Sequence, residues 1–545
     1  MCIKDVVNLL FKYLLVFFLL MSTYASILTI YNGSENSSIL RVFSDDEVSQ
    51  VDRLQGMMKD ESLDAGGFRG GFYHYGQAYN AMAYALINAL EFVGFEKFDY
   101  QISVLVLKFI SITGYILSVI LIYLALRHLG VSESISSIFA LIFGVHSDYW
   151  GWATTIHPDT LQMCLMLAAF LLALKIKPIN FAILLSSLFI GLSFGTKYSG
   201  IFLAVFIASL VFINTIARVV DNKEDNVNYF VNLGSWSTLS FFLGWVALNP
   251  HVLSRFNKLL EDLSFQRENL TSLGGGKVLN NQWTEWVSMY SDEYELVAIF
   301  IAAGFLSLFV YALHFLFKSK TNKWKLELFS DRKAMVLTSI VLYVLIASLY
   351  LFIVIHYKEW RYSFHLLPFV IIVSAYGFHL LIKWINRTYI TLPVLFLALF
   401  LVIPKGVSNF QMLAQTHYME LKNPYVAAGK WLKGKYGKED RILAGTYSYV
   451  DSEYFKNIAY TYDLNRLAIE THSPDVIFMN DSVPGRYVWK KKDTLLSDND
   501  FIYKNEWKDR AMVDEYGVFL KEIASKESPW EIVYETNNVV IFERK

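Results

Sequence analysis

Long apolar stretches recur along the first three quarters of the chain. The hydrocarbon core of a bilayer is about 30 Å thick, and a helix needs about 20 apolar residues to cross it. The pattern of hydrophobic positions predicts eleven such helices, several of them short. They are Leu9–Ile30, Ser103–Leu126, Ser134–Val145, Thr160–Leu174, Ile179–Gly195, Ser199–Ile216, Leu233–Leu248, Leu296–Phe317, Ala334–Ile355, Phe364–Ile382 and Tyr389–Ile403. The sequence therefore predicts a polytopic α-helical membrane protein with about 11 transmembrane helices.

Basic residues in the short loops predict the orientation, because Lys and Arg are enriched on the cytoplasmic side. A cytoplasmic N-terminus places most basic loop residues inside. They are Lys4, Arg127, Lys175, Lys177, Arg218, Lys318, Lys320, Lys323, Lys325, Arg332, Lys333, Lys383 and Arg387. An odd number of spans then places the chain after residue 404 outside the cytoplasm.

Two segments have a second interpretation. Tyr75–Phe95 is apolar enough for a twelfth span, but an additional span would reverse every later segment and place the basic run at 318–333 outside the cytoplasm. Its apolar residues recur at helical spacing, so we predict a helix lying in the membrane interface. The N-terminal segment resembles a signal peptide, but its apolar run continues to Ile30, which favours an uncleaved first span.

Charge separates the last part of the chain from the rest. Residues 405–545 contain 20 basic and 21 acidic residues, about twice the charge density of residues 1–404. We predict a transmembrane domain at 1–404, with outer loops at 31–102 and 249–295, and a soluble extracytoplasmic α/β domain at 405–545. Its expected helices are Pro424–Tyr436, Leu464–Thr471 and Met512–Ile523, and its expected strands are Arg441–Ala444, Asp475–Met479, Trp530–Tyr534 and Val539–Phe542.

Composition narrows the class of protein further. Apolar residues make up 54% of the chain and charged residues 18%, whereas soluble proteins carry about 25% charged residues. A net charge of −1 gives no reason to expect nucleic acid as a partner. The only cysteines, Cys2 and Cys164, cannot build a disulfide framework or a cysteine metal site.

Acidic residues adjoin the predicted spans on the outer side. Asp45-Asp46-Glu47 opens the first outer loop, where burial and mutual repulsion would raise the pKa of at least one carboxyl. Such a group can act as a general base, although an acidic turn capping a helix is an equally simple interpretation. The fourth span begins after His157-Pro158-Asp159. Pro and Asp are common at the start of a helix, and alternatively Asp159 supplies a second carboxylate to the same outer cavity.

Basic residues also lie on the predicted outer side, where the enrichment of Lys and Arg in cytoplasmic loops makes them unexpected. Lys197 sits in a tight turn between two spans, and it either snorkels to the interface or serves a site. Lys358 and Arg361 join the ninth and tenth spans, and an anionic ligand such as phosphate would explain them. Alternatively, Arg361 pairs with Glu359, and His251 only follows the end of a span. The shared outer location predicts one site that handles a hydroxyl nucleophile and a phosphate leaving group.

The order of these motifs resembles the GT-C glycosyltransferases, in particular the protein mannosyltransferase and aminoarabinose transferase relatives. Those enzymes move a sugar from a polyprenyl phosphate to an acceptor outside the cytoplasm. The matching elements are Asp46-Glu47, the stretch from Tyr73 to Tyr79, Asp159, Gly191-Leu192-Ser193-Phe194-Gly195-Thr196-Lys197, Asn249-Pro250-His251, and Arg361-Tyr362 with Leu367-Pro368. The first loop departs from the family pattern by reading Ser-Asp-Asp-Glu, so either Asp45 or Asp46 could be the base.

The resemblance implies a role for each candidate residue. The catalytic group is Asp46 as general base, Asp159 orienting it or the acceptor, and Glu47 supporting the loop. The donor phosphate is bound by Lys197, Arg361 and Lys358, and candidate acceptor or sugar contacts are Asp45, Tyr75, His157 and His251. Attack from the opposite face would invert the anomeric configuration. No cofactor is required, although Asp46 and Asp159 could hold a divalent cation such as Mg or Mn.

The expected protein is thus an integral membrane glycosyltransferase that transfers a monosaccharide, a hexose or a pentose, from a polyprenyl-phosphate donor. Its partners are that lipid, membrane lipids and an acceptor that is a protein, a lipid or a polysaccharide. The alternatives are a lipid-linked oligosaccharide ligase or polymerase, and a polytopic transporter or flippase. A transporter would place charges near the centres of its spans, which are nearly free of charge here.

Overall fold

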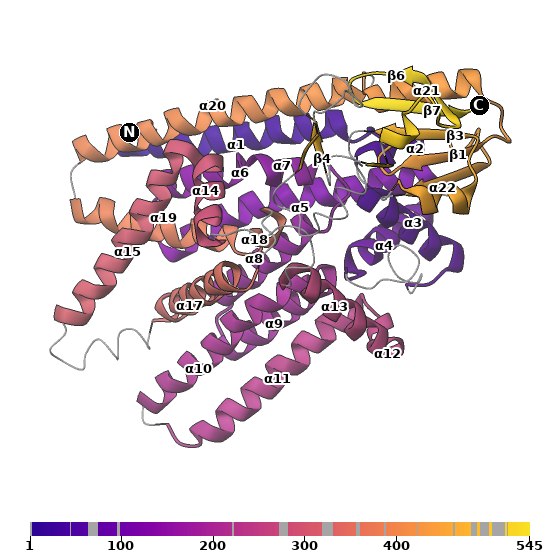
Figure 1. The fold of residues 1–545 in the computed structure, drawn as a ribbon. Coiled ribbons are helices and arrows are strands. Elements are labelled where there is room, and N and C mark those ends of the chain that lie inside the picture. The colour runs from indigo at the N-terminus through magenta and orange to yellow at the C-terminus, as the bar shows by residue number, and fades with distance from the viewer. Residues whose placement is uncertain are drawn as a thin grey trace.

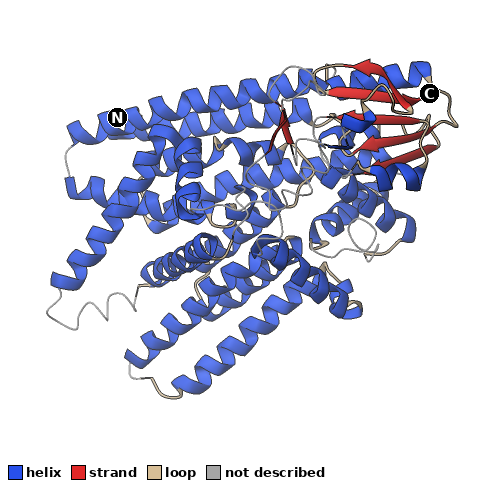
Figure 2. Cartoon of the chain, in the orientation of Figure 1, coloured by secondary structure: helices blue, strands red, loops and turns tan. Residues whose placement is uncertain are grey.

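Helices form most of the protein, and among the residues that the structure describes, strands occur only after residue 440 (Figure 2). The computed structural model describes residues 3–43, 45–63, 75–94, 99–220, 223–271, 282–318, 331–355, 360–385, 388–420, 422–461, 464–480, 488–490, 501–503, 518–519 and 521–545. The helices before the C-terminal unit are α1 (Ile3–Thr29), α2 (Ser37–Phe43), α3 (Asp45–Asp60), α4 (Ala78–Phe92), α5 (Tyr100–Leu129), α6 (Glu133–Gly144), α7 (Ser147–Ala153), α8 (Asp159–Lys175), α9 (Ile179–Thr196), α10 (Ala204–Val220), α11 (Asn226–Ala247), α12 (His251–Ser254), α13 (Phe256–Thr271), α14 (Gln282–Tyr294), α15 (Ala298–Lys318), α17 (Arg332–Ile353), α18 (Trp360–Ser363), α19 (Leu367–Ile385) and α20 (Thr388–Glu420), with 3-10 helices η1 (Tyr198–Leu203) and η3 (Glu295–Val297).

Seven helices in the described part of the chain are long and apolar enough to cross a membrane. They are Asp5–Thr29, Tyr100–Leu129, Ile179–Thr196, Tyr198–Val220, Arg332–Ile353, Leu367–Ile385 and Leu392–Gln415. The bent pair Trp286–Tyr294 and Ala298–Val310 would make an eighth. The protein is therefore a multi-pass membrane protein.

The expected count of eleven spans is not confirmed and stays a prediction. At about 1.5 Å per residue, the 12 residues of α6 reach about 18 Å and the 17 residues of α8 about 26 Å. Both helices are shorter than a bilayer core is thick and are mostly buried. The segment with the ambiguous pattern forms α4, whose 15 residues pack against α3 and α5.

The termini lie at opposite ends of the helical bundle (Figure 1). Helices α1 and α20 run side by side, and the N-terminus is far from the C-terminal unit. The end of α10, the start of α11 and the start of α20 lie at the N-terminal end. This arrangement fits an odd number of spans, and which end faces the cytoplasm stays a prediction.

The C-terminal unit is a mixed sheet between helices. It contains α21 (Pro424–Lys435), β1 (Arg441–Gly445), β2 (Asn457–Thr461), α22 (Arg466–His472), β3 (Val476–Asn480), β6 (Trp530–Glu535) and β7 (Val539–Arg544), and β4 (Val488–Lys490) pairs with β5 (Phe501–Tyr503) in a separate ribbon. The sheet order is β2-β1-β3-β7-β6. The first three strands are parallel, and β7 pairs antiparallel with both β3 and β6. Helix α21 covers one face and α22 the other. The expected boundary at residue 405 falls inside α20, which continues without a break to Glu420.

Candidate active site

A buried ion pair joins the start of α8 to the end of α9. Asp159 is the first residue of α8, and Lys197 follows the last residue of α9. The Nζ of Lys197 donates to Oδ1 of Asp159 at 2.6 Å, and both side chains are more than nine-tenths buried. Gln162 Nε2 donates to the carbonyl of Lys197 at 2.8 Å, which fixes the turn. The structure therefore brings together two residues that the sequence placed 38 positions apart.

Aromatic rings and a histidine surround this pair. The Nδ1 of His157 contacts Oδ2 of Asp159. The ring of Trp152 lies 4.2 Å from the His157 ring, and the ring of Tyr75 meets it edge-on at 6.1 Å. The Nζ of Lys197 also lies 5.9 Å from the centre of the Tyr75 ring. Tyr75 and His157, both predicted sugar or acceptor contacts, thus border the Asp159–Lys197 pair.

The charge states of this cluster follow from burial and from its partners. Burial alone would raise the pKa of Asp159, but Lys197 and His157 outweigh it and hold that pKa well below its usual range. Burial lowers the pKa of His157, which Asp159 only partly opposes. At neutral pH the site therefore contains a carboxylate, an ammonium and a neutral imidazole.

The first outer loop brings the other two carboxylates to the same place. Asp46 and Glu47 lie in the first turn of α3, where the helix dipole favours negative charge. Glu47 Oε2 accepts a hydrogen bond from the backbone N–H of Ile156 at 2.9 Å, and the residue is 2% exposed. Burial raises the pKa of Glu47, and the neighbouring Asp46 adds to that rise. Asp46 is half-buried and directly precedes Glu47, whose partner Ile156 directly precedes His157, so the acidic pair adjoins the Asp159 cluster.

A buried lysine that the sequence analysis did not single out supports this arrangement. Lys108 lies in α5 and is 3% exposed. Its Nζ donates to the carbonyls of Asn32 at 2.5 Å and Thr29 at 3.3 Å, at the end of α1. It also opposes the rise in the pKa of Glu47. Its signal in the sequence was a lone Lys within an apolar stretch.

The segment that carries Tyr75 is pressed against the end of α9. A Cβ on Gly76 would lie 1.8 Å from the carbonyl oxygen of Gly195, so only glycine allows this approach. The next residue, Gln77, donates its backbone N–H to Oδ1 of Asn249 at 2.6 Å, and its Oε1 lies 2.9 Å from Nδ1 of His251. His251, a predicted acceptor contact, therefore anchors the first outer loop through Gln77.

A second histidine near the site also escaped the sequence analysis. His365 lies just before α19, is 3% exposed, and stacks on the ring of Phe202 at 5.0 Å. Burial and then Lys197 lower the pKa of His365 to about 3, while Asp159 opposes them. Both charges of the Asp159–Lys197 pair thus act on the pKa of His365, in opposite directions.

Three predicted site residues stay untested. Lys358 and the side chains of Arg361 and Asp45 lie outside the described residues. In the described ranges, no group of three or more His, Cys, Asp or Glu residues is spaced to hold a metal ion. A divalent cation at Asp159 would have to compete with Lys197 and His157, which already contact its two carboxylate oxygens.

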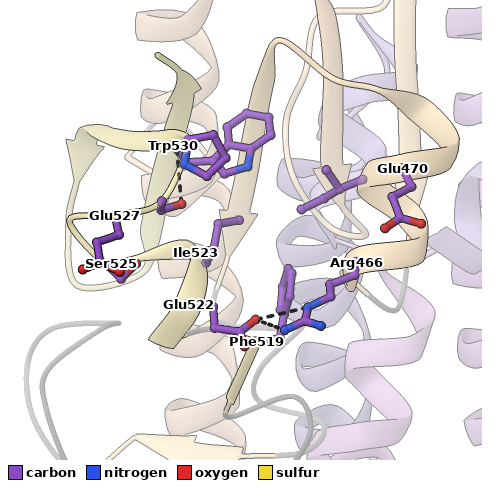
Figure 3. A pocket seen from close by; sticks show the side chains of 11 residues that line it. Arg466, Glu470, Phe519, Glu522, Ile523, Ser525, Glu527 and Trp530 are labelled. Atoms are coloured by element: carbon purple, nitrogen blue, oxygen red, sulfur yellow. Dashed lines mark hydrogen bonds and ion pairs between the residues drawn. The ribbon is translucent and has the colours of Figure 1, made fainter.

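A separate recess of about 370 Å³ lies in the C-terminal unit (Figure 3). Arg466 and Glu522 form an ion pair at its edge, and Phe519, Ile523 and Trp530 give it an apolar wall. All of its lining residues belong to the C-terminal unit, so none of the predicted site residues that the structure describes faces it.

The fold is similar to two kinds of solved membrane enzyme. An oligosaccharyltransferase from Archaeoglobus fulgidus, in the apo form, aligns with a TM-score of 0.54 and 11% identity over 96% of this chain and 80% of that chain. ArnT from Cupriavidus metallidurans, bound to undecaprenyl phosphate, aligns with a TM-score of 0.50 and 10% identity over 97% of each chain. The oligosaccharyltransferase has also been solved in complex with Zn and sulfate, and that structure aligns with a TM-score of 0.50 and 10% identity over 96% of this chain and 78% of that chain.

By sequence, no protein-family model and no curated protein matches the chain. The similarity is therefore one of fold, and it spans nearly the whole chain rather than one segment. It is the fold that the order of the sequence motifs predicted. The chain has the GT-C glycosyltransferase fold.

Proposed function

We propose that the protein transfers a monosaccharide from a polyprenyl phosphate to an acceptor hydroxyl on the extracytoplasmic face of the membrane. The observation that carries this proposal is that the turn of Asp46 and Glu47 binds the N–H of Ile156, directly before the contacts that His157 and Lys197 make with Asp159. The alignment with ArnT, bound to undecaprenyl phosphate, over 97% of both chains supports a lipid phosphate as the donor.

Lys197 is suited to hold the donor phosphate. An ammonium group can donate up to three hydrogen bonds, and one of them goes to Asp159. The positive charge of Lys197 would attract the oxygens of a phosphate at the same place. Arg361, which precedes His365 by four positions, would add a bidentate contact to the phosphate. Together these cations would stabilise the negative charge that develops as the bond between the sugar C1 and the phosphate oxygen breaks.

Asp46 is suited to be the general base. It is half-buried and therefore reachable, whereas Glu47 is buried and engaged by the N–H of Ile156. Asp159 is held by Lys197 and His157, so it orients the cluster rather than accepting a proton. The acceptor hydroxyl would lose its proton to Asp46 while attacking C1 from the face opposite the phosphate, which inverts the anomeric carbon.

A donor assay tests the proposal. Purified protein in nanodiscs is given a panel of polyprenyl-phosphate sugars, and product is measured by mass spectrometry. We expect transfer from at least one monosaccharide donor. Asp46→Asn should lower the rate by about 100- to 10,000-fold, the usual contribution of a general base. Asp60→Asn, an exposed carboxylate at the end of the same helix, is the matched control and should keep full activity.

The same assay separates the alternatives. Because the fold is also that of an oligosaccharyltransferase, lipid-linked oligosaccharides belong in the panel. Transfer from oligosaccharide donors only would favour a ligase or polymerase. Movement of donor lipid across the membrane without any transfer product would favour a flippase. Full activity of both Asp46→Asn and Asp45→Asn would exclude the proposed base.

A further inference from the structure

The short helix that leads into the acidic pair is covered by the C-terminal unit. Helix α2 ends at Phe43, and α3 begins with Asp45, so one residue separates them. Ser38 of α2 meets Ser452 of the C-terminal unit, with 3.0 Å between their hydroxyl oxygens. The Ser38 hydroxyl also accepts a hydrogen bond from the backbone N–H of Ser452 at 3.1 Å. Residues more than 400 positions apart thus form a direct contact.

Apolar and cation–π contacts extend this interface. Val42 packs with Val426 and Tyr449 of the C-terminal unit, and all three are less than one-tenth exposed. The residue directly before Val42 also contacts this unit, because the guanidinium of Arg41 lies 4.3 Å from the centre of the Tyr460 ring. Complete burial of aliphatic and aromatic side chains stabilises a contact by about 1.5–3 kcal/mol each. The interface is therefore a packed contact rather than a chance approach of two surfaces.

The loop that presents this surface is itself held rigidly. Asp451 accepts hydrogen bonds from the backbone N–H groups of Glu453 at 3.0 Å and Tyr454 at 3.2 Å. It also pairs with Lys433 of α21 at 2.6 Å. A Cβ on Gly429 of α21 would lie 2.0 Å from the carbonyl oxygen of Tyr449, so helix and loop are in close backbone contact. A rigid loop can transmit position to whatever rests on it.

We propose that the C-terminal α/β unit is a positioning element of the active site: by holding α2, it sets the place of Asp46 and Glu47 opposite Asp159. The pair is then fixed from two sides, by the N–H of Ile156 at Glu47 and by the C-terminal unit through α2. This inference rests on the proposed function only for the role of Asp46. The positioning itself is a physical property of the first outer loop, and it can be measured without any substrate.

Hydrogen–deuterium exchange of the full-length protein tests the positioning directly. Val42→Asp places a charge in the buried contact, and Tyr449→Ala removes its largest ring. We expect backbone exchange in residues 37–50 to become roughly tenfold faster or more in each variant, which corresponds to about 1.4 kcal/mol of lost protection. Arg466→Ala is the control, because its exposed ion pair with Glu522 lies at the recess of the same unit (Figure 3) and is separate from the contacts that Ser452, Tyr449 and Tyr460 make with α2.

Val42 belongs to α2 and not to the C-terminal unit, so its substitution leaves the core of that unit intact. Unchanged exchange in residues 37–50 of Val42→Asp would overturn the inference. Where the wild type transfers sugar, both interface variants should lose at least tenfold in kcat, with a smaller change in the KM for the donor lipid. Full kcat in both variants would overturn the inference and leave the proposed function standing.

A disulfide between α2 and the C-terminal unit tests the same contact by locking it instead of disrupting it. Ser38→Cys and Ser452→Cys place two thiols where the hydroxyl oxygens are 3.0 Å apart. We expect the double variant to form this disulfide readily and the oxidised protein to transfer sugar as fast as the reduced protein, because the docked state is the active one. Failure of the disulfide to form, or loss of transfer on oxidation that reduction restores, would contradict the proposal. An inactive wild type with a normal disulfide would instead refute the proposed function alone.

Discussion

Single residues decide the electrostatics of the candidate site. Asp159, Lys197 and His157 are all buried, and Asp159 contacts both of the others. A carboxylate without partners at this depth would take up a proton, and an ammonium without partners would lose one. The cluster therefore keeps two opposite charges in place before any ligand arrives, which lowers the cost of reorganisation when a phosphate binds.

The Asp159–Lys197 pair offers a test that separates stability from activity. Removing one partner leaves a buried charge uncompensated, which costs about 3–5 kcal/mol, whereas removing both charges costs less. We expect Asp159→Asn and Lys197→Met each to lower the thermal midpoint in detergent. The double variant should recover part of that loss and still transfer no sugar.

Thermal unfolding and the donor assay measure the two effects side by side. Lys59→Met, an exposed lysine of α3, is the control and should change neither the midpoint nor the rate. Recovery of transfer in the double variant would mean that the pair is only structural. A double variant less stable than both singles would contradict the assignment of a buried ion pair.

At the scale of elements, the site depends on how closely the first outer loop approaches α9. Gly76 and Gly195 bring two backbones together, and Asn249 at the end of α11 holds the contact through Gln77. Asn249 also donates to the carbonyl of Trp245 at 2.8 Å, so its side chain bridges the loop and the helix. The approach places Tyr75 over Lys197 and beside His157.

Gly76→Ala tests this approach. The new Cβ would lie 1.8 Å from a backbone oxygen, so the loop and α9 must move apart. We expect a lower thermal midpoint and a loss of donor affinity, because Tyr75 and the Gln77–Asn249 hydrogen bond are displaced. Gly151→Ala is the matched control, because a Cβ there meets no atom within 4 Å and alanine favours a helix. Equal thermal midpoints and equal donor affinities in the two variants would show that this close approach contributes neither to stability nor to donor binding.

At the scale of the whole molecule, buried histidines link stability to pH. Burial, as the largest cause, lowers the pKa of His146, His251 and His365 to about 3. In the unfolded chain each would bind a proton near pH 6.5. Between those pH values the unfolded state binds more protons than the native state, so stability falls as the pH drops from about 6.5 toward 3.

Thermal midpoints between pH 7.5 and pH 5 measure this dependence. We expect the midpoint to fall with decreasing pH and to fall less steeply in His146→Gln, which cannot take up the proton. His472→Gln, at an exposed position of α22, should leave the slope unchanged. A wild-type midpoint that rises on acidification would contradict the sign of these pKa shifts.

Much of the fold could be predicted from local pattern. The expected segments Pro424–Tyr436 and Arg441–Ala444 correspond to α21 and β1 within one residue at each end, because caps and alternating burial are local signals. The span count stays a prediction. Helices α6 and α8 are apolar and mostly buried by other helices, and burial in protein and burial in lipid leave the same hydrophobic signature in the sequence.

The sequence by itself determined that the chain enters a membrane, that its last part forms helices and strands, and which acidic and basic residues are out of place beside apolar helices. Those properties depend on neighbours along the chain, so they can be read locally. The tertiary structure alone decided that Lys197 pairs with Asp159, that Glu47 binds the N–H of Ile156, and that the C-terminal unit rests on α2. Each of these depends on contacts across dozens to hundreds of residues, whose geometry is set only when the helices pack.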